Sequence, residues 1–463
     1  MVCHGAMPVQ PRIPPGVLEL LPAQQLAHQR MLDTIRRGFE RFGFLPVETP
    51  VFELSEVLLT KSGGETEKEV YFVQSTGALA QGKQPELALR FDLTVPLARY
   101  VAQHEGQLNF PFRRYQIQRV YRGERPQHGR YREFYQADID VIGKDTLPLA
   151  YDAELPAVIY GIFDELRFGA FTIKINNRKL LRGVLESLAI PADKHADVLH
   201  EVDRLGKQTA GQVIEKLAAH VESGIANTLV AVLTDPDWRG TLKRLISATS
   251  PPSELSPHPI RTGLEELERV YDGTLALGVP EDSLRVDLSI VRGLDYYTGT
   301  VYETFLDDHP KLGSICSGGR YDNLAGHYTK SKLPGVGISI GVTRLFAQLL
   351  ELGVIAGDRR SIAHAIVLNV DPTFALDYAK IASELRAAGR NTEVYGGDDK
   401  LGKQFKYADK GGIPLALIYG SRERDAGVVK LKDLRVTDTT ISNEHEVPRA
   451  GLVAKVGELL AVD

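Results

Sequence analysis

The chain has 463 residues and a formal net charge of −5 at pH 7, and this length suggests two to four domains. A polyanionic partner must therefore be bound by local basic patches, because the chain has no overall positive field. Two cysteines, Cys3 and Cys316, are too few for a zinc site or a disulfide framework, which fits a reducing cytoplasm. The N-terminus lacks a signal-peptide pattern, and no apolar run approaches the length of a membrane span.

The first elements expected along the chain are a Pro-rich flexible segment, residues 1–16, and a long amphipathic helix from about Pro22 to Phe42. A short strand broken by Pro46 and Pro50 follows. The pattern then predicts strands at 69–75 and 87–92 and a helix starting at Pro96. A further helix is expected at about 149–166. Asp92 and Thr94 precede the helix on one expected strand face, where they could hold an ammonium group or, equally, cap the helix.

The stretch from Phe112 to Gly143 carries the strongest functional signal. Seven arginines and no lysine fall between Arg113 and Arg132, and two runs of period-two alternation flank a polar tip at 125–129. This pattern predicts a β-hairpin with strands near 114–123 and 131–142. Side chains two apart on a strand share a face, so four polar or aromatic groups point the same way: Arg130, Phe134, Gln136 and Asp140. Arginine forks bind phosphate and an aromatic face stacks a base, which indicates a phosphate-handling site rather than a solvated ribbon.

A change of pattern after Asn177 indicates an insertion, because residues 178–257 read almost wholly as helix. Strands resume at 283–290 and continue through Tyr302. The next motif, residues 317–324, reads as a Gly-Gly turn that carries Arg320. Residues 335–352 then read as strand, glycine hinge and helix, with Arg344 in the first helical turn. A cation there opposes the helix dipole, which hints at an anionic ligand.

The last hundred residues alternate strand and helix, which predicts a small α/β domain with a mainly parallel sheet after a linker at 354–362. The preceding body is better described as α+β. Residues 397–404 nearly match a phosphate-binding loop, but Gln404 stands where a Mg²⁺-binding hydroxyl is required. Three lysines on one face of the following helix could touch RNA phosphates or be simply solvated: Lys403, Lys406 and Lys410.

Four ordered motifs together carry a family resemblance. GFLPVETPVFE resembles motif one of the class II aminoacyl-tRNA synthetases, a dimer element whose proline is here Pro50; YRGE with GRYREF resembles motif two, and GVGISIGVTRLF resembles motif three. RGLDYYTGTVYE resembles the signature of histidyl-tRNA synthetases and their paralogues, so the chain is similar to that family over nearly its whole length. Asp92 in RFDLTVP and Asp140 stand at positions where many bacterial members of the family carry Glu. Asp at these positions resembles the eukaryotic enzymes and some bacterial ones.

The resemblance implies an α+β fold with an antiparallel-sheet catalytic domain, a helical insertion and a C-terminal α/β anticodon-binding domain. The implied boundaries are an N-terminal segment at 1–16, a catalytic domain at 17–177 and 258–353, the insertion at 178–257, and the anticodon-binding domain at 363–463.

Site roles also follow from the resemblance. Catalysis would rest on Arg122 and Arg292, both acting on the α-phosphate of ATP. The implied ATP contacts are Arg122, Glu124, Arg130, Phe134 and Arg344. The implied histidine contacts are Asp92, Thr94, Gln136, Asp140, Arg292, Tyr296 and Tyr297. The hairpin tip would touch the tRNA acceptor end through Arg125, Gln127 and His128.

The implied reaction is ATP-dependent ligation of L-histidine to tRNA(His) through histidyl-adenylate. The resemblance also implies a cytoplasmic homodimer that uses ATP with Mg²⁺ as substrate. No structural metal and no membrane association are expected. The alternative is a non-catalytic histidine sensor like the regulatory subunit of ATP phosphoribosyltransferase. Such paralogues usually lack the C-terminal domain and some nucleotide-binding arginines, which are present here. An RNA-binding sensor like those appended to stress kinases is a third reading, but the chain has no kinase segment.

Overall fold

A computed structural model describes residues 10–59, 70–125, 129–206, 208–249, 259–291, 297–322, 325–357, 359–436 and 442–461. The chain divides into two compact units. The first comprises Met1–Glu19 with Met31–Ile355, and the second comprises Leu20–Arg30 with Ala356–Asp463.

The first unit is built on an eight-stranded sheet in the order β1-β5-β6-β11-β10-β9-β7-β8. All neighbouring strands run antiparallel except the outermost pairs, β1–β5 and β7–β8, which are parallel. The strands are β1 (Leu45–Pro46), β5 (Phe112–Tyr121), β6 (Glu133–Ile142), β7 (Phe171–Asn177), β8 (Leu284–Val286), β9 (Thr300–Leu306), β10 (Cys316–Tyr321) and β11 (Gly335–Gly341). The predicted α+β class with an antiparallel sheet is therefore confirmed.

The predicted arginine-rich hairpin forms strands β5 and β6. The two strands pair in one continuous register, from Phe112 opposite Ile142 to Tyr121 opposite Glu133. On the side of the tip, the pairing stops about two residues earlier than predicted: β5 ends at Tyr121 and β6 begins at Glu133. On β6, Ala137, Ile139 and Val141 are fully buried in the core, so the alternate residues between them face the other side of the sheet.

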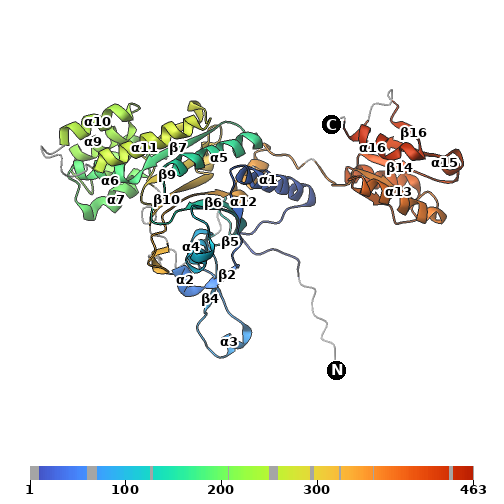
Figure 1. The fold of residues 1–463 in the computed structure, drawn as a ribbon, viewed down its shortest axis with the longest axis horizontal. Helices are drawn as coiled ribbons and strands as arrows, with labels where there is room; N and C mark the ends of the chain where they lie inside the picture. The colour runs from blue at the N-terminus through green and yellow to red at the C-terminus, as the bar shows by residue number, and fades with distance from the viewer. Residues whose placement is uncertain are drawn as a thin grey trace. The chain divides into compact units, whose positions relative to one another are not determined.

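Helices cover both faces of this sheet (Figure 1), with α5 and α11 on one side and α4 on the other. They are α1 (Pro22–Arg41), α4 (Thr94–His104), α5 (Ala150–Leu166), α11 (Pro259–Ala276) and α12 (Val342–Glu351). Four of them match predicted helices, whereas α11 was not predicted. α11 packs on α5 and β7, where the Thr274 hydroxyl donates to the Ala153 carbonyl at 3.0 Å.

The segment between β1 and α4 forms a small second sheet in the order β2-β4-β3. Its strands and helices are β2 (Phe52–Leu54), α2 (Ser55–Leu59), β3 (Phe72–Val73), α3 (Thr76–Ala80) and β4 (Leu87–Leu89). The predicted strands at 69–75 and 87–92 are present but shorter.

The predicted helical insertion consists of short helices in its described part. They are α6 (Arg178–Ser187), α7 (His195–Val202), α8 (Ala210–Leu217), α9 (Ser223–Thr234) and α10 (Trp238–Thr249). Helix α6 is capped by the Asn177 side chain, which accepts from the backbone N–H groups of Lys179 and Leu180.

The Gly-Gly turn predicted at residues 317–324 is wrong. Gly318 and Gly319 lie inside strand β10. A Cβ at Gly318 would lie 2.1 Å from the Gly337 carbonyl oxygen, and one at Gly319 would lie 2.7 Å from the Tyr297 ring. Both glycines therefore serve close packing rather than a bend. Arg320 is a buried structural residue, since it pairs with Asp152 at 2.6 Å.

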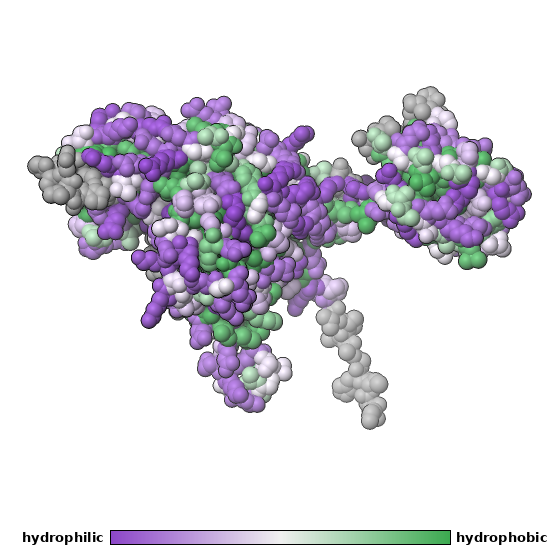
Figure 2. Space-filling model, viewed as in Figure 1, coloured by the Kyte–Doolittle hydropathy of each residue, from purple (hydrophilic) through white to green (hydrophobic). Residues whose placement is uncertain are grey.

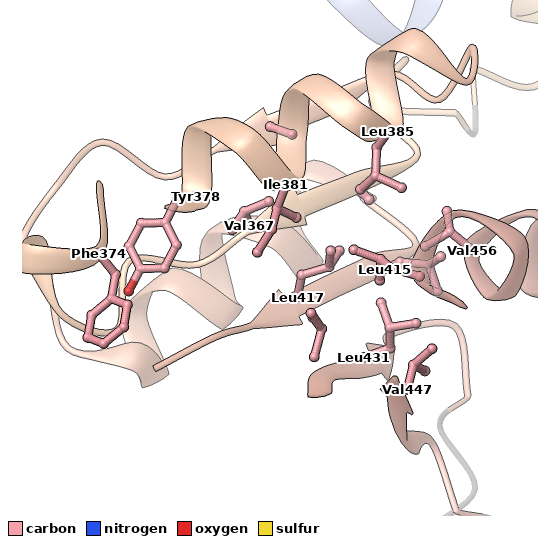
Figure 3. Packing of buried hydrophobic residues seen from close by; sticks show 14 residues of the cluster. Val367, Phe374, Tyr378, Ile381, Leu385, Leu415, Leu417, Leu431, Val447 and Val456 are labelled. Atoms are coloured by element: carbon pink, nitrogen blue, oxygen red, sulfur yellow. The ribbon is translucent and has the colours of Figure 1, made fainter. Parts of the chain in front are cut away.

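The second unit has a five-stranded sheet in the order β13-β12-β14-β15-β16. Its elements are β12 (Ala365–Val367), α13 (Ala375–Ala387), β13 (Thr392–Val394), α14 (Leu401–Gly411), β14 (Leu415–Ile418), α15 (Ser421–Ala426), β15 (Val428–Asp433), β16 (Glu444–Pro448) and α16 (Leu452–Leu460). The α/β class is confirmed, but the sheet is mixed rather than mainly parallel, because β15 and β16 add two antiparallel pairs. Figure 3 shows its own core, in which Ile381 and Leu385 of α13 face Leu417 and Leu415 of the sheet.

Gln404 of α14 explains why the near-match to a phosphate-binding loop is not one. Its side chain is fully buried, and its amide donates to the carbonyl oxygens of Asn369 and Asp399. Lys403, Lys406 and Lys410 of the same helix are exposed, as predicted. Over the part of the chain that the structure describes, no helix combines the length and apolar character needed to span a bilayer.

Candidate active site

A cavity of about 720 Å³ opens on the face of the large sheet that carries the even-numbered side chains of β6. Its walls come from β6, β10 and β11 and from the first turns of α4 and α12. Nine of the predicted site residues line it: Asp92, Thr94, Arg122, Glu124, Arg130, Phe134, Gln136, Tyr297 and Arg344. Residues far apart in the sequence therefore meet in one place, as the family resemblance implies.

Two described residues of the predicted site, Asp140 and Arg125, do not line this cavity. Asp140 lines a smaller hollow of about 30 Å³, which shares Thr94, Asp138 and Tyr297 with the main cavity. Arg125 is exposed near the hairpin tip. The others lie outside the described residues: Arg292, Tyr296, Gln127 and His128.

The rim of the cavity is rich in arginine. The Arg122 Nε donates to the Phe91 carbonyl at 3.1 Å, and its guanidinium lies 5.2 Å from the centre of the Phe134 ring. Arg130 is 62% exposed and pairs with Glu124 at 2.9 Å. These contacts hold Arg122 against the wall while leaving Arg130 largely in solvent. The rim can therefore meet the oxygens of a polyphosphate.

The first turn of α12 places Arg344 beside this rim. The Thr343 hydroxyl accepts a hydrogen bond from the Tyr135 N–H of β6 at 2.8 Å, which ties the helix to the strand. Arg344 donates to the Leu312 carbonyl. The turn at Gly129 has a φ of 75°, and a Cβ there would lie 2.9 Å from the Gln348 side chain of α12, so glycine is required.

The floor of the cavity is acidic. Asp92 accepts a hydrogen bond from the Val95 N–H at 3.1 Å, so one oxygen caps α4 while the residue also lines the cavity. The capping role left open by the sequence is therefore seen for Asp92, although Asp92 and Thr94 lie beyond the end of β4 and not on a strand. The Gln136 amide nitrogen donates to the Ser339 hydroxyl at 2.9 Å.

Asp140 lies deeper and is already well bonded. One oxygen accepts from the Tyr321 hydroxyl at 2.7 Å, and the other lies 2.6 Å from the Arg114 guanidinium. A Cβ on the neighbouring Gly337 would lie 2.0 Å from this carboxylate. Glycine at that position of β11 therefore makes room for the buried ion pair.

Burial raises the pKa values of the carboxyl groups on the floor. It raises the pKa of Asp92 to about 6, against the Val95 N–H and the Arg122 charge, which lower it. It raises the pKa of Asp138 to about 7, against the Arg114 charge. The pKa of Asp140 is also raised by burial, and Arg114 and Tyr321 oppose the shift. Such clustered shifts are typical of functional sites that await a charged ligand.

Tyr297 closes one side of the floor. Burial raises the pKa of its phenol, and the neighbouring Asp140, Asp138 and Asp92 raise it further. The hydroxyl therefore stays protonated and can donate a hydrogen bond to a ligand.

Sequence reasoning missed Asp138, Ser339 and the Arg114 partner of Asp140. Asp138 lies between Gln136 and Asp140 in the same alternation, so the period-two pattern that singled out its neighbours also includes it. Ser339 and Arg114 carried no such signal, because their positions depend on which strands flank β6.

Comparison with known proteins places this geometry in a family. A family model for histidyl-tRNA synthetase matches residues 16–345, and a model for an anticodon binding domain matches residues 364–459. A histidine–tRNA ligase from Stenotrophomonas maltophilia (strain K279a) is 56% identical over 461 residues, which cover 96% of this chain and 97% of the relative. The chain belongs to the histidyl-tRNA synthetase family. Family membership together with both domains makes it an enzyme that joins histidine to tRNA.

Solved structures agree with this family. The crystal structure of histidyl-tRNA synthetase from Nostoc sp. PCC 7120 is 38% identical, with a TM-score of 0.87 over 97% of this chain and 100% of that one. An ATP phosphoribosyltransferase regulatory subunit/histidyl-tRNA synthetase from Bacillus halodurans C shares the fold, with a TM-score of 0.70 at 20% identity over 86% of this chain and 97% of that one. The enzyme carries an anticodon-binding domain, which argues against the non-catalytic reading.

Proposed function

We propose that the cavity activates histidine with ATP to form histidyl-adenylate, and that the enzyme then passes histidine to the 3′-hydroxyl of the terminal adenosine of tRNA(His). The observation that carries this mechanism is the division of one cavity into an arginine rim and an acidic floor. A polyphosphate is attracted to the rim, and an ammonium group to the floor. A volume of about 720 Å³ lies within the range of small-molecule sites.

The roles proposed for the rim follow from its chemistry. Arg122 would grip the α-phosphate and the substrate carboxylate, and Arg130, the most exposed, would meet the γ-phosphate. Phe134 would stack on adenine, with Glu124 at its amine and Arg344 on the other side. Arg292 would stabilise charge on the α-phosphate. Catalysis then consists mostly of positioning and charge stabilisation.

Magnesium would enter with ATP as part of the substrate complex. Among the described residues, no cluster of three or more His, Cys, Asp or Glu side chains could hold a metal ion. We propose that Mg²⁺ is bound by the phosphates of ATP.

The roles proposed for the floor concern histidine. Asp92, Thr94 and Gln136 would hold its α-ammonium group at the first turn of α4 and the start of β6. Asp140 and Tyr297 would recognise the ring, with Tyr296 packing alongside.

Histidine-dependent exchange of pyrophosphate into ATP tests this mechanism directly. We expect exchange with L-histidine and none when histidine is omitted, because the floor must be filled for the carboxylate to reach the α-phosphate. Histidine binding without exchange would instead support the non-catalytic sensor.

Replacing Asp140 with asparagine should raise the histidine KM in pyrophosphate exchange at least 10-fold while the ATP KM changes less than twofold. The substitution removes the charge near the ring and leaves Arg114 without its anion, at a cost typical of hydrogen bonds to charged groups. Steady-state exchange at varied histidine and varied ATP measures both constants. Equal losses for histidine and ATP would show that Asp140 only supports the fold.

The proposed tRNA contacts lie in both units. The hairpin tip, with Arg125 exposed and with Gln127 and His128, would touch the acceptor end. The second unit would bind the anticodon arm, with phosphate contacts from Lys403, Lys406 and Lys410 on α14. We place the reaction in the cytoplasm, where tRNA is charged.

We further propose that two chains associate through the small sheet β2-β4-β3. Phe52 and Leu54 of β2 are 51% and 44% exposed, and Leu87, opposite Leu54 on β4, is 39% exposed. Figure 2 shows hydrophobic side chains gathered where this segment joins the α3 lobe. An exposed apolar strand face of this kind promotes aggregation unless another protein surface covers it. Pro50 of the motif that resembles the class II dimer element lies next to it.

Replacing Phe52 with aspartate should convert a dimer into a monomer, because a charge would be buried in the proposed interface. Size-exclusion chromatography with light scattering should report twice the chain mass for the wild type and once for the variant. Leu376→Asp is the matched control, since Leu376 is 77% exposed on α13 of the second unit and is not part of this sheet. A variant at Phe52 that keeps the wild-type mass would rule out this surface.

A further inference from the structure

Among the described residues, the acidic floor has three carboxyl groups, and the guanidiniums whose charges act on them are those of Arg114 and Arg122. Asp92, Asp138 and Asp140 are close enough that each alters the titration of another. Arg114 is the buried guanidinium among them, and its ion pair is with Asp140. A ligand with a cationic or strongly donating group would therefore be stabilised next to a carboxylate other than Asp140.

Asp138 is the carboxylate with an oxygen to offer. Its side chain is 2% exposed, and its Oδ1 atom has no hydrogen-bond partner among the described residues. On β6 it lies between Gln116 of β5 and Ser339 of β11. It lines both the main cavity and the small hollow behind it. Both oxygens of Asp140, by contrast, are occupied by Tyr321 and Arg114.

We infer that Asp138 accepts the ring N–H of the bound histidine through Oδ1 and is a specificity-determining residue for this reaction. The inference rests on the proposed function and adds a second carboxylate to the ring site. Asp140 then also positions Arg114 and Tyr321 around the hollow. A competing amino acid with an apolar side chain of similar size would leave the buried Asp138 without a hydrogen-bond donor. The free-energy cost of that unsatisfied group makes the site discriminate strongly against such an amino acid.

The titration of Asp138 supports this assignment. Burial raises its pKa to about 7. The charge of Arg114 and a hydrogen bond from Ser339 lower the pKa, whereas the nearby carboxylates of Asp140 and Asp92 raise it further. Tyr297 and Cys316 also face it, and both remain protonated, because burial raises the pKa of each. Asp138 is thus partly protonated in the empty site at neutral pH. Accepting a ring N–H favours the ionised form, so histidine binding should release a proton from it.

Replacing Asp138 tests the inference through the histidine requirement. We expect Asp138→Asn, which keeps an acceptor but loses the charge, to raise the histidine KM in pyrophosphate exchange roughly 10-fold. Asp138→Leu, which removes the acceptor at similar size, should raise it roughly 100-fold or more. The ATP KM should change less than twofold in both variants. Asp287→Asn is the control, because this carboxylate, directly after β8, pairs with Lys174 of β7 and lines neither cavity.

Proton release and stability separate recognition from a structural role. Calorimetry of histidine binding in two buffers of different ionisation enthalpy should show fewer protons released by Asp138→Asn than by the wild type.

The folded pKa of Asp138, about 7, lies above its ordinary 3.8. Its contribution to stability is therefore present below about pH 3.8 and lost as pH rises through about 7. At pH 8 the Tm of Asp138→Asn should equal or exceed that of the wild type, whereas Asp140→Asn should lower it by leaving Arg114 unpaired.

Two results would overturn the inference while leaving the proposed function intact. One is a wild-type histidine KM and wild-type proton release in both Asp138 variants. The other is a Tm of Asp138→Asn at pH 8 below that of the wild type, including failure to fold, which would make Asp138 structural. A wild-type enzyme without histidine-dependent exchange would instead defeat the proposed function itself.

Discussion

Replacing Arg122 with alanine is expected to slow histidine-dependent pyrophosphate exchange by roughly 10²- to 10³-fold, with a smaller effect on the ATP KM. A preorganised cation aimed at charge that develops in the transition state typically contributes about 3–4 kcal/mol. Arg122 is preorganised, because its Nε is bonded to the Phe91 carbonyl at 3.1 Å and its guanidinium lies against the Phe134 ring. Single-turnover formation of histidyl-adenylate measures the chemical step directly.

Arg119→Ala is the matched control for this experiment. Arg119 belongs to the same hairpin, but it is 51% exposed, pairs with Glu133 at 3.0 Å and lines neither cavity. Exposed pairs of this kind contribute little, so its removal should change the rate less than twofold. If the two alanine variants slowed the reaction equally, the rim arginine would have no special part in catalysis.

Ending the chain after Gly357 is expected to leave histidyl-adenylate formation near the wild-type rate while aminoacylation of tRNA(His) falls by at least 100-fold. Every described residue that lines the cavity belongs to the first unit, and the removed part has a separate core around Leu415, Leu417 and Tyr378. A lost tRNA-binding surface removes both phosphate contacts and orientation of the acceptor end. Pyrophosphate exchange and tRNA charging on the same preparation measure the two steps.

This experiment needs a sizing measurement, because the truncation could also loosen a dimer. Full-length protein with Lys403, Lys406 and Lys410 all changed to alanine provides a second control that keeps the fold of the second unit. It should charge tRNA less well than the wild type at low salt, with the difference shrinking as salt is raised, because salt weakens the phosphate contacts that only the wild type makes. A truncated protein that remains dimeric and charges tRNA at the full rate would contradict the anticodon assignment.

Much of the architecture was readable from the sequence, because it depends on local periodicity. Helix α1, the β5–β6 hairpin and the strand–helix alternation of the second unit all repeat at the period of their own secondary structure. Local pattern also selected one face of β6, since alternate residues on a strand must share a face. The ordered motifs then indicated that Asp92, Arg122 and Arg344 serve one site, and the structure brings all three to one cavity.

Other features were decided only by contacts between distant segments. Gly318 and Gly319 look like a turn in isolation, but the closeness of Gly337 and Tyr297 places them inside a strand. The antiparallel pairs of β15 and β16 likewise leave no local signal of their partners.

The same limit applies to the floor of the active site. Alternation on β6 treats Asp138 and Asp140 alike. The register of β5 places Arg114 opposite Asp140 and Gln116 opposite Asp138, so one carboxylate gains a cation while an oxygen of the other has no hydrogen-bond partner within the described part of the chain. A strand pattern determines which side of a sheet a residue faces, but the neighbouring strands determine its charge partner, because the electrostatic energy of a buried carboxylate depends on groups within a few ångströms in space.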